Sequence, residues 1–273
     1  MLQYCKRGWI VATLSSLISF VVHGFDFEAQ IGLEGRYFAE AGVTGQNQGN
    51  LSGWIKPKLY YELDEGNDQC HLQGFFRLDQ NDDERTHGDL REAYWLHIGD
   101  YLDIQIGVGK VFWGVTESQH LVDIINQTDL VESPDGEEKL GQPMFMISTA
   151  QGNTLLDVFV LPYFRERTFP GEDGRLGPPF PVREADSRYE SGAEEKHVDY
   201  AVRWAIVGDG IELSLSHFHG TSREPFLLFD GNSADPELIA FYPQIEQTGL
   251  VSQYISGSWL WKFEGIIRSG FGD

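Results

Sequence analysis

Cysteine is scarce in this sequence, and so are basic residues and long apolar runs. The two cysteines are Cys5 and Cys70, and we expect Cys5 to be removed with the N-terminal segment described below. A chain that keeps Cys70 alone cannot form an intrachain disulfide, so something else must stabilise it. After residue 24, the longest apolar run covers residues 158–164 and contains Pro162. Because a membrane-spanning helix needs about 20 apolar residues, we expect no such helix after residue 24.

Basic residues are outnumbered by acidic ones. The chain has 20 lysines and arginines against 42 aspartates and glutamates, which gives a formal net charge of −22. Nucleic acids and anionic membrane surfaces bind proteins of the opposite charge. The composition therefore argues against both of them as partners.

Residues 1–24 differ from the rest of the chain. Lys6 and Arg7 precede an apolar run over residues 9–22, and Gly24 follows shortly after it. This order is typical of a secretory signal peptide, here cleaved after Gly24. The alternative is a single membrane anchor, but serine and threonine interrupt the run and it is short for a spanning helix. We predict a signal peptide over residues 1–24 and one domain over residues 25–273.

Alternation of apolar and polar residues is the main pattern of that domain. In residues 102–109, apolar positions such as Ile104 alternate with polar ones such as Asp103, as in a strand with one apolar face. The same pattern predicts about eleven strands, at residues 25–37, 55–63, 72–79, 90–98, 102–109, 144–149, 155–164, 198–206, 211–216, 245–255 and 259–264.

Residues 90–109 form the clearest hairpin, with a very short turn between its two strands. In the first strand, alternation puts Tyr94 on one face and Arg91 and Trp95 on the other. A strand with one apolar face and one polar face suits the wall of a transmembrane barrel, which has lipid outside and water inside.

Short and long connections alternate along the predicted strands. The short ones lie near residues 66, 100, 152, 209 and 257, and the long ones near residues 47, 84, 128, 180 and 230. A secreted β-sandwich is the other all-β candidate, but it has no reason to place every long loop at one end. Outer-membrane barrels have short periplasmic turns and longer extracellular loops. The sequence thus predicts an all-β fold, an antiparallel transmembrane β-barrel.

The long connection after residue 114 is predicted to contain a short amphipathic helix. Thr116 and Gln119 have capping-box spacing, and Leu121, Ile124 and Ile125 follow at helical spacing. If this segment folds into the lumen, it forms a constriction. The alternative is a helix outside the lumen, which would expose its apolar side.

Four segments carry a resemblance to a known group of proteins. They are GKVFWG at residues 109–114, DIINQTD at 123–129, FRER at 164–167 and QTGL at 247–250. With these segments, the chain resembles a poorly characterised group of porin-like outer-membrane proteins of Gram-negative bacteria. The resemblance implies a barrel and transport across the outer membrane, with no settled solute. Because the predicted strand number is odd and the chain stops at Asp273, we expect the barrel to be truncated at its C-terminus.

Charged residues on the polar face of the predicted strands are the candidate functional residues. The predicted pore-lining residues are Lys56, Lys58, Glu62, Arg77, Asp79, Arg91, Asp103, Asp157, Asp199, Arg203, Lys262 and Glu264. The predicted constriction residues are Glu117, Asp123, Asn126 and Asp129. Charges that line a lumen set the field that a passing solute meets. The alternative is that they are ordinary hydrated wall residues without selectivity.

These patterns predict a porin-like channel in the outer membrane for passive passage of small polar solutes. A barrel-embedded hydrolase is one alternative, although no Gly-x-Ser-x-Gly motif is present. A plugged structural or adhesive barrel is another. The expected partners are outer-membrane lipid and small polar solutes, and we expect no cofactor and no metal. His217 and His219, for example, lack a third ligand nearby.

Overall fold

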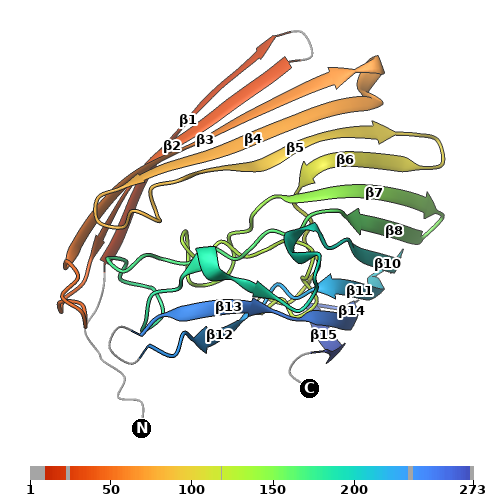
Figure 1. Cartoon of the computed structure of the whole chain (residues 1–273). Coiled ribbons are helices and arrows are strands. Elements are labelled where there is room, and N and C mark those ends of the chain that lie inside the picture. Colours follow the sequence, from red (N-terminus) through yellow and green to blue (C-terminus); the bar gives the residue numbers. More distant parts are fainter. Residues whose placement is uncertain (1–9, 23–24, 118, 233–235, 271–273) are drawn as a thin grey trace.

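The computed structural model describes residues 10–22, 25–117, 119–232 and 236–270. These residues form a 12-stranded antiparallel sheet and a separate three-stranded sheet (Figure 1). The helical structure within this part of the chain consists of the 3-10 turns η1 (Asp64–Gly66), η2 (Glu184–Asp186) and η3 (Glu194–Lys196). Across the same residues, no helix combines the length and the apolar character of a membrane span.

The strands of the main sheet follow one another in chain order, so that each pairs with its neighbours along the sequence. They are β1 (Ile10–Val22), β2 (Phe25–Tyr37), β3 (Gly49–Leu63), β4 (Asp68–Asp79), β5 (Gly88–Ile98), β6 (Asp103–Gly109), β7 (Gln142–Gln151), β8 (Thr154–Leu161), β10 (Asp199–Gly208), β11 (Ile211–Thr221), β14 (Gln244–Ser256) and β15 (Trp259–Ser269). All eleven predicted strands are confirmed, and β1 is the twelfth.

Strand β1 lies within the predicted signal peptide. It pairs with β2 over its whole length, with Leu14 opposite Leu33 and Ser15 opposite Gly32. Leu14 therefore continues the apolar face of β2, whereas Leu17 lies opposite the polar Gln30. Removal of residues 1–24 on export stays a prediction.

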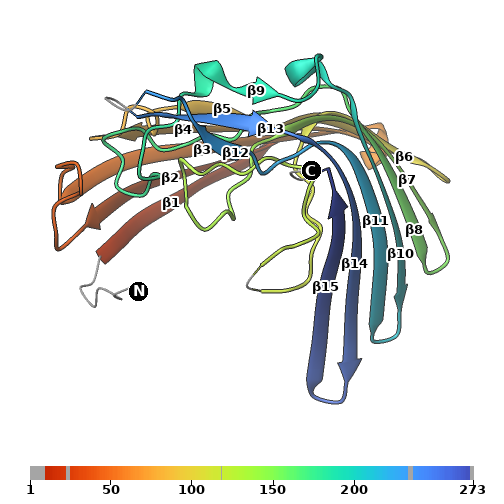
Figure 2. The ribbon, with the colours of Figure 1, turned by 60° about the horizontal axis from the view of Figure 1, so that its bottom comes forward.

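The sheet curls strongly but is open, because β1 and β15 form its two edges in the described part of the chain (Figure 2). The antiparallel sheet is thus confirmed, whereas a closed barrel is not observed. Its connections alternate as predicted, with short turns at residues 64–67, 99–102, 152–153, 209–210 and 257–258 and long loops at 38–48, 80–87, 110–141, 162–198 and 222–243. Gly210 and Gly257 have φ values of 74° and 61°, which favour glycine in these tight turns.

The long loops gather at one end of the main sheet and include the small sheet. That sheet consists of β12 (Phe226–Phe229), β13 (Leu238–Tyr242) and β9 (Arg188–Tyr189), with β13 in the centre. Beneath it, Phe164, Phe169, Ala240 and Tyr242 form a buried apolar cluster. The loop end is therefore packed, with a core of its own.

The outward face of the main sheet is a band of exposed apolar side chains. Exposed members occur on β1 to β6, β8, β10, β11, β14 and β15, among them Leu14, Ile31, Leu51, Leu72, Phe76, Leu90, Ile106, Val158, Val202, Leu215, Leu250, Trp261 and Ile267. In water, such a large apolar surface is unusual, and it marks a surface that another apolar phase or molecule covers.

One β-bulge changes the facing of β5. Gln73 pairs with Glu92 and Gly74 with Leu90, so Arg91 is an extra residue with no direct partner on β4. An extra residue reverses which side chains face inward beyond it. The prediction that Tyr94 lies on the face opposite Arg91 is therefore wrong.

The predicted helix after residue 114 is also wrong. Residues 116–129 form turns and bends in the described part of this segment. Val122, Ile124 and Ile125 are all almost fully buried, at 0 to 3 % exposure, so this part of the segment is packed on more than one side. Backbone N–H groups near its start bond to Glu264 of β15 rather than to carbonyls one turn away.

Candidate functional site on the concave face

The long connection between β6 and β7, residues 110–141, is here called the inner loop. It contacts strands near both ends of the main sheet. Glu132 of the loop pairs with Arg77 of β4. Near the start of the loop, the backbone N–H of Val115 donates to Glu264 of β15. Asp123 connects the two parts of the loop, because it binds both Lys139 and the Trp113 backbone N–H. One loop can reach strands so far apart in the sheet only on the concave side. The inner loop thus lies inside the curl (Figure 2).

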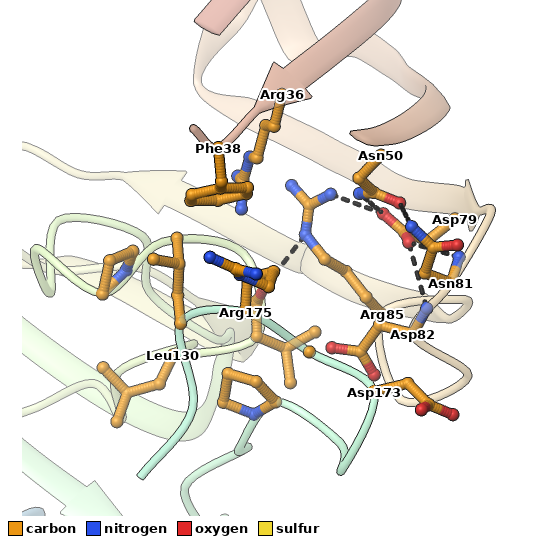
Figure 3. Close-up of a pocket in the computed structure, with 15 residues that line it drawn as sticks. Arg36, Phe38, Asn50, Asp79, Asn81, Asp82, Arg85, Leu130, Asp173 and Arg175 are labelled. Atoms are coloured by element: carbon orange, nitrogen blue, oxygen red, sulfur yellow. Dashed lines mark hydrogen bonds and ion pairs between the residues drawn. The ribbon is translucent and has the colours of Figure 1, made fainter. Parts of the chain in front are cut away.

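At the loop end, a narrow cavity of about 30 Å³ lies between the inner loop and three other long loops, at residues 38–48, 80–87 and 162–198 (Figure 3). Arg36, Arg85, Leu130 and Arg175 are among the residues that line it. The Arg175 guanidinium lies 4.4 Å from the centre of the Phe38 ring. The loops therefore close together at this point and leave room for only a few water-sized atoms.

Arg77 is the main contact between the wall and the inner loop. Its Nε and Nη2 atoms donate to the Glu132 carboxylate, with Nη2 2.6 Å from Oε2. Its Nη1 atom donates to Ser52 Oγ at 2.7 Å and lies 3.5 Å from Glu34 Oε2. Arg77 and Glu132 are 6 % and 7 % exposed, so water screens this pair little.

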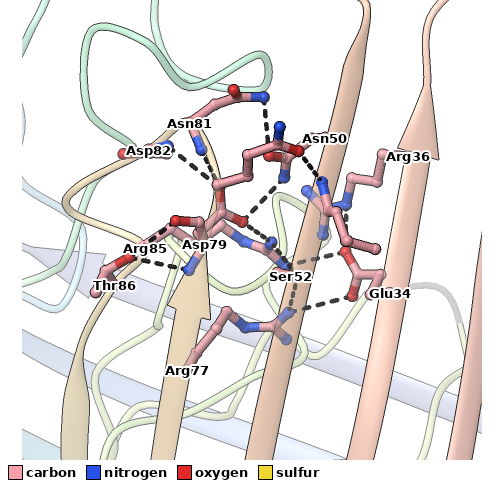
Figure 4. A network of polar contacts seen from close by, with 12 residues as sticks. Glu34, Arg36, Asn50, Ser52, Arg77, Asp79, Asn81, Asp82, Arg85 and Thr86 are labelled. Atoms are coloured by element: carbon pink, nitrogen blue, oxygen red, sulfur yellow. Dashed lines mark hydrogen bonds and ion pairs between the residues drawn. The ribbon is translucent and has the colours of Figure 1, made fainter.

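Arg85 extends the same network toward the loop end (Figure 4). Its Nη1 donates to Asp79 at 2.7 Å, its Nη2 donates to Glu34 at 3.1 Å and its Nε donates to the Val131 carbonyl at 3.1 Å. Arg36 pairs with the same Glu34. The three arginines face three carboxylates, so the network balances its charges while it holds the inner loop against β2, β3 and β4.

A second buried pair fixes the middle of the inner loop. Arg91, the bulge residue of β5, donates to Asp129, and Thr168 Oγ1 donates to the other oxygen of that carboxylate at 2.7 Å. Burial raises the pKa of Asp129, but the charge and hydrogen bond of Arg91 outweigh it and hold that pKa below its usual range. The bulge thus supplies the charge that keeps a buried carboxylate ionised.

Glu264 of β15 anchors the start of the inner loop. Its Oε1 accepts hydrogen bonds from Val115 N at 2.7 Å, Thr116 N at 3.0 Å and Thr116 Oγ1 at 2.9 Å. Its Oε2 accepts from Val122 N at 3.4 Å. One wall carboxylate therefore satisfies four donors of a segment that has no regular structure.

Apolar residues of the inner loop cover the concave face of β7, β8, β10, β11 and β14. Trp113 packs edge-on against Phe159, with ring centres 5.6 Å apart. Val122 and Ile125 belong to the same buried cluster, together with Phe218 of β11. This half of the concave face is therefore filled.

The concave face of β2 to β5 is polar near the short turns. His71 stacks on Tyr94 with ring centres 4.5 Å apart, and Tyr60 contacts the other side of His71 at 4.7 Å. Lys58 and Glu28 lie beside this aromatic row and line, with Tyr60 and His71, a hollow of about 320 Å³. This hollow leaves room for water along the concave face of the wall.

All twelve predicted pore-lining residues lie on the concave face, but they are engaged in different ways. Five contact the inner loop: Lys56, Arg77, Arg91, Lys262 and Glu264. Four contact other wall residues or another loop: Asp79, Asp157, Asp199 and Arg203. Lys58 lines the hollow, Glu62 accepts from Tyr60 and Asp103 accepts from Gly99.

The predicted constriction residues have separate positions in the inner loop. Glu117 is exposed and pairs with Lys262. Asn126 is 1 % exposed and bonds to the carbonyls of Gly109 and Leu140, and Asp129 is buried against Arg91.

Asp123, the fourth of these residues, accepts a hydrogen bond from the Trp113 backbone N–H. Burial raises the pKa of Asp123, and Lys139 at 3.3 Å offsets this only in part. Asp123, Asn126 and Asp129 thus hold the inner loop together.

Sequence reasoning missed Glu132 and Arg85 as site residues. Both lie in loops without periodicity, so alternation cannot assign them a face. The available signal was weak: Arg85 is a single arginine that directly follows the acidic segment at residues 79–84.

Comparisons with known proteins give no family for this chain. No protein-family model, curated protein or solved structure matched it. Within the described ranges, no group of three or more His, Cys, Asp or Glu residues could hold a metal ion.

Proposed function

We propose that this protein is a porin-like channel in the outer membrane of a Gram-negative bacterium. Small polar solutes pass through it passively, along the concave face. The observation that carries the proposal is the opposite chemistry of the two faces of one curled sheet. The outward face is apolar on nearly every strand, whereas the concave face carries twelve charged candidate residues.

Lipid is the medium that suits the outward face. In water, isolated exposed apolar residues are normal, but a continuous band over many strands is not. In a bilayer the same band is the lipid-facing surface of a barrel wall. A bilayer offers no water to the unpaired backbone groups of an edge strand. The proposal therefore requires both edges of the sheet to be paired in the membrane: β15 at one edge, and at the other β1, or β2 once residues 1–24 are removed.

The inner loop is the constriction in this proposal. It is fixed to the wall by Arg77, Arg91 and Glu264 and fills the β7 to β14 half of the concave face. Solutes therefore pass on the other side of the loop, along Lys58, Glu28 and the aromatic row. Charges in a confined passage act on solutes more strongly than the same charges on an open surface.

The test is conductance of the full chain, refolded in detergent and inserted in planar lipid bilayers. The proposal predicts discrete current steps and swelling of liposomes in solutions of small sugars or amino acids. Membranes that receive the same detergent without protein are the control.

A plugged barrel without transport is the second candidate, because apolar residues of the inner loop belong to a buried cluster that includes the wall strands β7, β8, β10, β11 and β14. That candidate predicts inserted protein without current steps.

A further inference from the structure

A small cavity lies between the inner loop and the concave side of β10, β11 and β14. Its volume is about 30 Å³, and Trp113, Arg203, Glu212, Ser214 and Ser216 are among the residues that line it. It is distinct from the hollow along β2 to β4. A space of this size holds roughly two water-sized atoms.

Two residues that line this cavity each have an N–H donor with no acceptor in the protein. Trp113 Nε1 and Arg203 Nε are both buried, and neither makes a hydrogen bond. Trp113 is 2 % exposed, so its N–H cannot turn to bulk water. Buried donors in native proteins are nearly always paired, and an unpaired one costs free energy. An acceptor from outside the chain would satisfy these two donors.

Two hydroxyl groups add to the donor set. Ser214 and Ser216 are 4 % and 8 % exposed, and both line the cavity. Ser216 lies directly opposite Arg203 in the pairing of β10 with β11. Glu212 is 3.7 Å from Arg203 Nη2, at the terminal end of the guanidinium, and leaves the Nε atom unengaged.

We propose that this cavity binds the carboxylate group of a small solute. A carboxylate presents two acceptor oxygens and no donor, which matches two donor-only N–H groups and two rotatable hydroxyls. Its two oxygens also match the room available. The proposal rests on the proposed function, because it takes the bound solute to be a small monocarboxylate. The cavity itself lies in the half of the concave face that the inner loop covers, apart from the hollow along Lys58.

The experiment follows the indole N–H signals of the refolded, 15N-labelled full chain by NMR while sodium acetate is added at constant ionic strength with sodium chloride. The chain has seven tryptophans, and the Trp113→Phe variant assigns the signal of interest. We expect acetate to shift that signal saturably. Arg203→Gln should weaken binding about tenfold or more, because it removes a charged donor. Ser216→Ala should weaken it less, and Arg188→Gln, on the exposed surface, should leave it unchanged.

Three results would overturn the proposal. If chloride at the same concentration shifts the signal as acetate does, the site does not select a carboxylate over a simple anion. If neutral acetamide binds as well as acetate, the site does not select a carboxylate. If Arg203→Gln and Arg188→Gln behave alike, Arg203 is not part of the site. None of these readouts depends on current through a bilayer, so acetate binding without conductance would reject the channel and keep the site.

Discussion

Replacement of Glu132 by alanine should release the inner loop from the wall. The variant leaves the Arg77 guanidinium buried, with Ser52 at 2.7 Å and Glu34 at 3.5 Å as its remaining partners. Removing one partner of a buried ion pair typically costs about 3–5 kcal/mol. Because Arg77 keeps these two contacts, we expect the lower end, about 3 kcal/mol of unfolding free energy.

The measurement is denaturant unfolding of the refolded protein in micelles, followed by tryptophan fluorescence. Glu138→Ala is the matched control, since Glu138 lies on the same loop and pairs with Lys56 at 3.5 Å but has a side chain that is 42 % exposed. An exposed pair of this kind contributes about 0–1 kcal/mol. Equal losses in the two variants would refute the idea that the Arg77 network holds the loop.

Three further predictions concern the wall and the outer loops. Ile106 is 47 % exposed on the outward face, so Ile106→Lys should weaken membrane assembly by roughly 2–4 kcal/mol if it lies near the bilayer midplane. Gln105→Lys, on the concave face, should weaken it much less. The measurement is the folded yield in lipid vesicles, and equal yields for the two variants would count against a lipid-facing Ile106. Burial raises the pKa of Glu184, outside the strands, to about 7, above its unfolded value, so the folded state keeps the proton longer and loses stability as pH rises from about 4.5 to 7. After allowance for solvent exposure this loss is about 1–2 kcal/mol, and Glu184→Gln should remove that slope from unfolding curves measured between pH 4 and 8 while Glu190→Gln keeps it. A side chain at Gly32 would meet the Trp54 indole at 2.4 Å, so Gly32→Val should cost about 1–3 kcal/mol in the same unfolding assay, and Gly35→Val, where no atom lies within 4 Å, should cost less.

The strands could be predicted from the sequence because alternation is a local signal. Ile104 and Ile106 face outward and Gln105 faces inward, as their positions along one short segment imply. Such a pattern repeats in every strand whose two faces meet different surroundings. The loop lengths could be read in the same way.

The facing of β5 could not be predicted, because a β-bulge depends on pairing with another strand. Nothing in the segment around Arg91 marks it as an extra residue, and only the register with Gln73 and Gly74 shows it. Beyond the bulge, every residue of β5 faces the side opposite to the one that simple alternation from Arg91 predicts.

The conformation of the inner loop could not be predicted from the sequence either. The capping-box spacing at Thr116 is a local helix signal, but the partner that binds this segment is Glu264, 148 positions away. The pairing of Glu132 with Arg77 is likewise between distant residues. Tertiary contacts decided both, and local propensity carries no information about them.

Single-channel recording of the wild-type chain is the most direct test of the central claim, that a hydrated passage follows the concave face beside the inner loop. Insertion is checked first, by protection of the strands from protease in the same vesicles. We expect discrete current steps from inserted protein, and wider, noisier steps when Glu132→Ala loosens the loop. Inserted wild-type and variant protein that both carry no current above the detergent control would contradict it.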